Sequence, residues 1–169
     1  MIELRPLTID DLSTVRYIHT AAFSAAAQGH YSQREITSFT DYLRSPRYGE
    51  LLLGNPAVVA LMGADMVGTA VWCPTPPPGL TARILAVYVR PLFTGEGIGR
   101  KLIERMERDA QAAGFRAIEV SATRNAISFF EDIGYRHVRD GSWGLPSGAE
   151  IGVGFLRKAH GATFESAAE

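Results

Sequence analysis

The chain has 169 residues, of which 46 % are hydrophobic and 21 % are charged, which is enough apolar sequence for one full core and one domain. Its formal net charge of −1 excludes a broad electrostatic attraction to nucleic acid or to anionic lipid. The single cysteine, Cys73, excludes an intrachain disulfide framework, and no apolar run has the length of a membrane span or the pattern of a secretion signal. These features predict a cytoplasmic protein, most easily a bacterial one.

The first half of the chain contains both helical and strand patterns. The expected elements are a strand over residues 2–7, helices over 12–23 and 33–43, and a hairpin of strands over 57–61 and 66–72. Either Thr8 or Asp10 is the expected N-cap of the first helix. Ser32 and Glu35 form a capping box that predicts the start of the second helix, and Pro46 predicts its end.

The second half alternates strands and helices around a long amphipathic segment. The expected elements are a central strand over residues 84–89, helices over 98–113 and 124–132, a strand over 117–121, and strands over 135–140 and 150–157 joined by a loop over 141–148. Residues 74–78 predict a stiff proline-rich connection, and residues 159–169 a polar tail beyond one domain of residues 1–158. The pattern predicts an α/β fold, α+β-like, with a mixed sheet of about seven strands flanked by four helices.

A glycine-rich run, Thr94-Gly95-Glu96-Gly97-Ile98-Gly99, separates the central strand from the long helix. Glycines let the backbone approach a ligand closely, and the first amides of a helix have no intrahelical partners. With the helix dipole, such a turn suits a phosphate or pyrophosphate. The spacing excludes a Walker loop, because neither Ser nor Thr follows Lys101, and it excludes the G-x-G-x-x-G dinucleotide fingerprint. A glycine-rich turn without a ligand is the alternative.

Two longer motifs favour the ligand-binding interpretation. Residues 89–102 read V-x-P-x-x-x-G-x-G-I-G-x-x-L, and residues 125–135 read NAISFFEDIGY. The first resembles the acetyl-CoA loop of the GNAT superfamily of N-acyltransferases, and the second resembles the last motif of the same superfamily. The resemblance implies a sheet that splays open between its fourth and fifth strands, with pantetheine in the opening. His30-Tyr31-Ser32 also resembles a segment that overhangs the acceptor cleft in one group of these proteins.

The resemblance assigns acetyl-CoA, as co-substrate, to residues of both motifs and of the central strand, and it implies no metal. The assigned residues are Val87, Tyr88, Val89, Thr94, Gly95, Glu96, Gly97, Ile98, Gly99, Arg100, Asn125, Phe129 and Phe130. It implies that the main chain of the central strand pairs with pantetheine as an added strand would, and that the loop amides hold the pyrophosphate. Thr94 stands where the family usually has Arg or Gln, so weaker binding is expected, but not its loss.

The reaction implied is attack of a neutral amine on the thioester, with the Val89 amide as donor to the oxyanion. Arg83 stands where many relatives carry a glutamate base, so the base is unassigned. His30 is the candidate with the most suitable unperturbed pKa, and Glu35 and Asp41 lie in the same acceptor-facing region. The alternative for His30 is an ordinary loop histidine. His19 and His137 are interpreted as structural.

The usual tyrosine acid is also absent, because Phe130 occupies its position. Tyr88 substitutes for it only if its ring faces the cleft, and core packing is the alternative. A covalent route through Cys73 lacks a partner His or Asp at recognisable spacing, which favours a structural thiol.

These observations together predict an acetyl-CoA-dependent N-acetyltransferase that acts on a small amine or an exposed protein amine. A non-catalytic acetyl-CoA sensor is the rival, and a partner-binding module without CoA is a third interpretation. The expected partner is an amine acceptor of unidentified structure, without nucleic acid or membrane, and a homodimer is left open.

Overall fold

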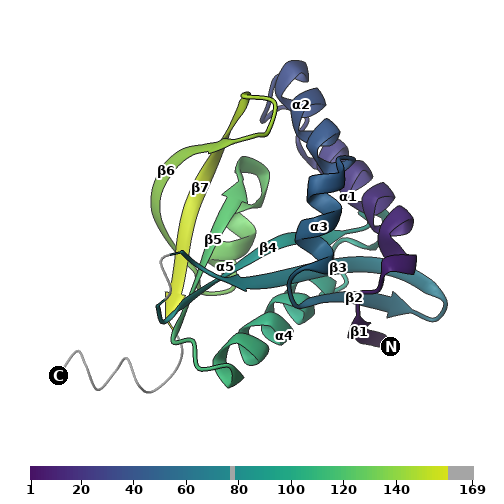
Figure 1. Ribbon diagram of the computed structural model, residues 1–169, viewed down its shortest axis with the longest axis vertical. Coiled ribbons are helices and arrows are strands. Elements are labelled where there is room, and N and C mark those ends of the chain that lie inside the picture. Colours follow the sequence, from purple (N-terminus) through teal and green to yellow (C-terminus); the bar gives the residue numbers. More distant parts are fainter. Residues whose placement is uncertain (77–78, 160–169) are drawn as a thin grey trace.

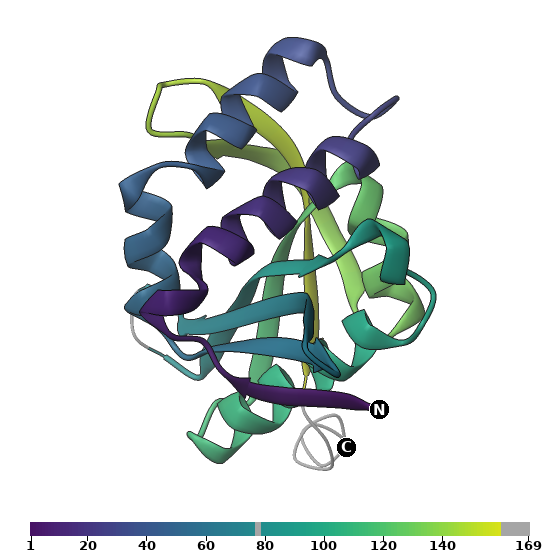
Figure 2. The same cartoon turned by 90° about the vertical axis from the view of Figure 1, so that its right-hand side faces the viewer.

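The computed structural model describes residues 1–76 and 79–159, in which helices cover both faces of one mixed sheet (Figures 1 and 2). The strands are β1 (Ile2–Pro6), β2 (Ala57–Met62), β3 (Asp65–Pro74), β4 (Thr81–Val89), β5 (Ala117–Thr123), β6 (Arg136–Gly144) and β7 (Glu150–Ala159). The α-helices are α1 (Leu12–Ala26), α2 (Gln33–Leu43), α3 (Pro46–Leu53), α4 (Ile98–Ala112) and α5 (Ile127–Asp132). Short 3₁₀ turns precede three of these helical regions: η1 (Ile9–Asp11), η2 (Pro91–Phe93) and η3 (Arg124–Ala126).

The seven strands lie in the order β1-β2-β3-β4-β5-β7-β6, and β4 with β5 is the parallel pair. That pairing joins residues 81–84 to residues 117–120 and then stops, although β4 continues to Val89 and β5 to Thr123. The two halves of the sheet therefore diverge at the carboxyl ends of their central strands (Figure 1). The predicted sheet and its splay between the fourth and fifth strands are confirmed.

A bulge in β4 accompanies the divergence. The register with β3 shifts between Thr69 and Val71, and Ala86 adopts φ +55°, a left-handed conformation that costs a non-glycine residue about 1–2 kcal/mol. The hydroxyl of Thr69 donates to the Ala86 carbonyl at 3.2 Å, which holds this conformation in place. The bulge changes which residues of β4 face which side of the sheet, and so it sets up the site described below.

Each face of the sheet carries its own core. Buried residues of α4, including Leu102 and Met106, pack with Phe130 of α5 on one face. On the other face α1, α2 and α3 contribute Ile18, Phe39, Leu52 and their neighbours. Both views show α4 separated from α1 by the sheet (Figures 1 and 2). This arrangement leaves the end of β4 between α1 and α5.

Three details of the prediction are wrong. Helix α3 was missed, because Ser45-Pro46 was interpreted as a helix end; Ser45 instead caps a new helix, accepting from the Tyr48 amide, with proline at its first position. The structure thus has five α-helices within its described residues, not four. The expected loop over 141–148 begins too early, because β6 continues to Gly144 in register with β7. The central strand starts at Thr81.

Of the remaining predictions, the hairpin is confirmed, and the proline-rich connection and the tail lie partly or almost wholly outside the described residues. The hairpin of β2 and β3 is confirmed. The proline-rich connection falls partly outside the described residues, and the predicted tail does so apart from Ala159. No helix in the described part of the chain is long and apolar enough to cross a membrane.

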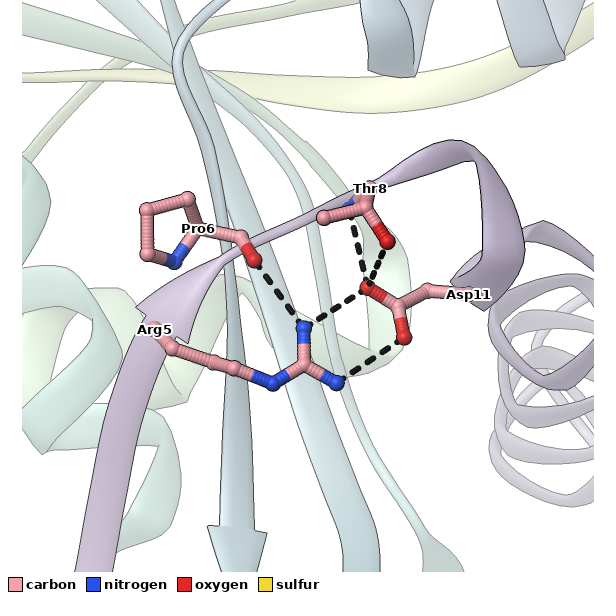
Figure 3. A network of polar contacts seen from close by, with 4 residues as sticks. All are labelled: Arg5, Pro6, Thr8 and Asp11. Carbon is pink, nitrogen blue, oxygen red and sulfur yellow. Dashed lines mark hydrogen bonds and ion pairs between the residues drawn. The ribbon is translucent and has the colours of Figure 1, made fainter.

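An ion pair connects β1 to the start of α1 (Figure 3). The Arg5 guanidinium donates to both carboxylate oxygens of Asp11, at 2.8 and 2.9 Å, and Asp11 also accepts from the Thr8 amide at 2.8 Å. The hydrogen bonds from Arg5 lower the pKa of Asp11 to about 2. The first strand and the first helix are thereby held at a defined angle. Thr8 is the N-cap of the 3₁₀ turn η1, whereas the N-cap of α1 is Asp11 and not the expected Thr8 or Asp10.

Candidate active site

A cavity of about 670 Å³ opens where β4 and β5 diverge. Its wall comprises the end of β4, the glycine loop, the start of α4, Thr123 of β5, the turn into α5 and the last turns of α1. Its volume lies within the range of roughly 300–1,000 Å³ that is usual for small-molecule sites. A sheet edge, a helix N-terminus and apolar side chains thus meet around one space.

The glycine loop has the backbone of an anion-binding turn. Gly95 and Gly97 have φ of +85° and +78°, in the left-handed region that favours glycine. Gly97 is the N-cap of α4 and provides no side-chain cap, so the first amides of the helix have no side-chain acceptor there. A Cβ on either glycine would meet no atom within 4 Å, so the space in front of the loop is open. The loop can accommodate a phosphate group at the positive end of the helix dipole.

Gly99 has a packing role instead. A Cβ at this position would lie 3.1 Å from Cζ of Phe129, so glycine lets α4 and α5 approach one another beside the cavity. Asn125 lies on the same wall, and its buried Oδ1 has no hydrogen-bond partner among the residues that the structure describes. A buried amide oxygen without a partner is costly in a folded protein. A ligand with N–H donors, such as the amides of pantetheine, would satisfy it.

A comparison with models of known protein families now identifies this arrangement. The model of the acetyltransferase (GNAT) family matches residues 12–135, which is well over half of the chain. This chain belongs to the GNAT family of acetyltransferases. The resemblance noted in the two sequence motifs is confirmed.

Solved structures of GNAT proteins share the fold of this acetyltransferase. A GCN5-related N-acetyltransferase from Rhodopseudomonas palustris is 23 % identical, with a TM-score of 0.84 over 94 % of this chain and 95 % of that one. PaiA N-acetyltransferase from Thermoplasma acidophilum, in complex with coenzyme A, is 19 % identical, with a TM-score of 0.70 over 95 % and 99 %. A GNAT acetyltransferase from Brucella melitensis, in complex with acetyl-CoA, is 18 % identical, with a TM-score of 0.66 over 96 % and 90 %. A comparison with curated proteins returns no match.

The GNAT cavity collects the residues that the sequence motifs assigned to acetyl-CoA. All of them line it except Glu96, whose side chain is exposed on the outside of the loop. The last turns of α1 were missed: Ala22, Ala25 and Ala26 line the cavity opposite the loop. The alanine-rich end of that helix was the available signal, because small side chains leave space for a ligand.

A second cavity of about 70 Å³ adjoins the first in this acetyltransferase. The two cavities share walls at Val87 and Tyr88 of β4, at Thr123, and at Ala126 and Phe130 beside α5. From there the second cavity extends under α2, α3 and the end of β6. The opening in the sheet therefore joins a large cavity to a small one.

Tyr88 contributes to the walls of both cavities and also packs in the core. Its ring lies 4.4 Å from the ring of His19, centroid to centroid, and burial raises the pKa of the Tyr88 hydroxyl above its ordinary value. Tyr88 thus packs against His19 and is also among the residues that line both cavities; that its ring faces the cleft stays a prediction. The hydroxyl stays protonated at neutral pH.

His19 is buried beneath the end of β4. Its Nδ1 lies 2.7 Å from the Tyr48 hydroxyl, and its Nε2 is hydrogen-bonded to the hydroxyl of Thr69. Burial lowers the pKa of His19 to about 3, so the imidazole is neutral at pH 7. His19 lines neither cavity. It links α1, α3 and β3 under the bulge of β4, and its structural interpretation agrees with this position.

Hydrogen bonds connect the segment between α1 and α2 to the end of β5 and to β7. The hydroxyl of Tyr31 accepts from the Arg124 amide at 2.8 Å and donates to the Gly152 carbonyl, and Arg124 in turn donates to the His30 carbonyl at 3.0 Å. The His30 side chain is exposed and lines neither cavity. The sequence suggested a catalytic role for His30, whereas the hydrogen bonds that hold this connection in place involve the side chains of Tyr31 and Arg124.

The other candidate groups are engaged elsewhere. Glu35 caps α2: its carboxylate accepts from the Ser32 amide at 2.9 Å, and this bond lowers the pKa of Glu35. Arg83 donates from Nε to Glu119 of the neighbouring strand at 3.0 Å. Cys73 is half-buried, and burial raises the pKa of its thiol, which disfavours the nucleophilic thiolate. Among the described residues, no group of three or more His, Cys, Asp or Glu is placed to hold a metal ion.

Proposed function

We propose that this GNAT protein transfers the acetyl group of acetyl-CoA directly to a primary amine. The proposal rests on one observation: an open glycine loop, the end of β4 and the Asn125 oxygen, which lacks a partner among the described residues, all line the large cavity. Gly95 to Arg100 would hold the pyrophosphate, and the main chain of Val87 to Val89 would hold the pantetheine arm as an added strand.

The proposed reaction is one displacement at the acetyl carbonyl. The lone pair of the amine forms a bond to the carbonyl carbon, and the tetrahedral oxyanion accepts a hydrogen bond from the Val89 amide. The carbon–sulfur bond then breaks, the sulfur leaves with its electron pair, and the nitrogen loses a proton. Residues that hold the two reactants together supply much of the rate, because they remove the entropic cost of their encounter.

Two residues are proposed for the proton transfers. Tyr88 borders the opening with a hydroxyl that burial keeps protonated, so it is the candidate to protonate the departing thiolate. His30 is the candidate base, on the connection that Arg124 ties to the end of β5. Because its side chain is exposed, His30 would reach the amine through water or through movement of the connection.

A second candidate function is an acetyl-CoA sensor without turnover. Two observations favour it: the Arg83–Glu119 ion pair occupies the place of the usual base on β4, and Phe130 has no hydroxyl where the family has its acid. The two functions predict the same binding and different chemistry.

A thiol-release assay separates them. Purified protein with acetyl-CoA and a panel of primary amines should release free CoA faster than acetyl-CoA and amine alone. Binding of acetyl-CoA by calorimetry without any amine-dependent release would support the sensor, and the absence of both would refute the acetyl-CoA assignment itself.

A further inference from the structure

The small cavity next to the acetyl-CoA cavity has a wall of unusual chemistry for an amine site. Five aromatic residues line it together with Leu51 and Leu85: Phe39, Tyr48, Tyr88, Phe130 and Trp143. Among the described residues, no Asp, Glu, Lys, Arg or His belongs to its wall. A charged group that entered it would lose water without gaining an ion-pair partner, which is costly.

Nearby carboxylates do not compensate for this. Glu119 is paired with Arg83, and Glu35 accepts from the amide of Ser32 at the start of α2. Neither lines the small cavity. Asp41, in the same acceptor-facing region, does not line it either. A second ammonium group, as in a diamine or a lysine side chain with its main-chain amine, would therefore meet no carboxylate among the described residues of the cavity wall.

The wall is also held in place by ring contacts. The ring centroid of Trp143 on β6 lies 5.9 Å from that of Phe39 and 6.0 Å from that of Tyr42, both on α2. Tyr42 in turn packs edge-on against Tyr48 of α3, at 5.2 Å. Both cartoon views place the tip of the β6–β7 hairpin beside α2 (Figures 1 and 2). Packed aromatic rings from three elements form a site of defined shape.

We propose that the small cavity is the acceptor site and that it selects a primary amine on a small apolar group, such as a short branched aliphatic chain. This inference rests on the proposed acetyl transfer, because an amine in the small cavity must reach the thioester in the large one, past Val87 and Tyr88, which line both cavities. A volume of about 70 Å³ is several times the roughly 10–15 Å³ that one water needs, and it suits a compact group rather than a peptide. The apolar part stays in the cavity, and the nitrogen points to the opening.

The first test compares apolar and polar amines on the unmodified protein. Isobutylamine and isoamylamine are the apolar probes; putrescine, spermidine and a peptide with an N-terminal alanine are the alternatives. The expected kcat/KM is at least tenfold higher for the apolar pair. An equal or higher kcat/KM for the polyamines or for the peptide would overturn the apolar-amine inference and leave acetyl transfer standing. Binding of acetyl-CoA without release by any of the amines would refute the proposed transfer, and the inference with it.

The second test places a carboxylate in the wall of the cavity. Leu51→Glu, on α3, should lower kcat/KM for isoamylamine at least tenfold and raise it for putrescine, whose second ammonium would then have a partner. Leu53→Glu is the matched control: the same substitution on the same helix, at a side chain that is 45 % exposed and lies outside the cavity, should change neither value.

A further variant covers the case in which Leu51→Glu does not fold. Leu51→Ala removes three carbons from the wall and should shift the preference from isoamylamine towards a longer apolar amine such as hexylamine. Unchanged preferences in a folded Leu51→Glu or Leu51→Ala would show that the acceptor lies elsewhere and would overturn the inference.

Discussion

Substitution of Gly97 by aspartate tests the glycine loop as a pyrophosphate site. Gly97 is the N-cap of α4 with φ +78°, it lines the large cavity, and a Cβ there would meet no atom within 4 Å. An aspartate would therefore point its carboxylate into open space in front of the first amides of the helix. It would compete with the pyrophosphate for those amides and repel it.

The magnitude follows from Coulomb's law. Two unit charges about 5 Å apart repel by about 0.8 kcal/mol in bulk water and by about 3 kcal/mol at the effective dielectric constant of about 20 typical near a protein surface. A tenfold loss of affinity corresponds to about 1.4 kcal/mol, which lies within this range. Calorimetry should therefore show acetyl-CoA affinity lowered tenfold or more. Gly97→Ala carries the backbone strain without the charge and should lose less.

The matched control is Gly63→Asp in the turn between β2 and β3. Gly63 also has a positive φ, +61°, and open space around its Cβ, but it does not line the cavity. Both aspartate variants pay a left-handed backbone cost of about 1–2 kcal/mol, so their melting temperatures should fall by similar amounts. Only Gly97→Asp should lose affinity. Equal acetyl-CoA affinity in both aspartate variants would refute the assignment of the loop.

Three further predictions concern buried and catalytic groups. Phe130 is buried and packs edge-on against Tyr135, so Phe130→Ala should lose about 3–5 kcal/mol of unfolding free energy in denaturant titrations. An unchanged unfolding free energy in Phe130→Ala would contradict the packing. Phe130→Tyr should keep acetyl-CoA binding and a single-turnover rate within about tenfold. His19 has a folded-state pKa of about 3, below its unfolded value of about 6.5, so its stabilisation is present above pH 6.5 and is lost as pH falls towards 3, by up to about 1.4 kcal/mol per pH unit. His19→Gln should flatten that slope in chemical denaturation, and an identical slope would exclude His19 as its cause. His30→Ala should lower turnover by roughly 10²–10⁴-fold if His30 is the base, and a normal rate would exclude it as the base.

The glycine loop shows how far local sequence reaches. Gly95 and Gly97 were interpretable without coordinates, because each answers a local requirement, a positive φ angle. The packing role of Gly99 was not, because its contact is with Phe129 of another helix. The motif around Asn125 was likewise recognisable from neighbouring residues alone. Most elements followed from periodicity for the same reason, since the apolar spacing of a helix or strand is a property of consecutive residues.

Pro46 and the residues after Asp140 show where local reasoning failed. A proline both ends one helix and suits the first position of another, and the choice depends on whether Tyr48 and Leu52 find a core to bury in. The extension of β6 depends on its pairing with β7 more than on the composition of residues 141–144. Both outcomes rest on partners that are distant in the sequence.

The sequence by itself determined the family, the sheet with its opening, and most of the residues that line the large cavity, because two contiguous motifs and the central strand contain them. It did not identify Ala22, Ala25 and Ala26 of α1. Only the tertiary structure decided that Tyr31 and Arg124 tie the α1–α2 connection, and that His19 lies beneath Tyr88. It alone brought α2, α3 and β6 together around an aromatic cavity. The physical reason is that the wall of the small cavity consists of single side chains from separate elements. Their proximity follows from how the helices pack on the sheet and from no pattern within any one element.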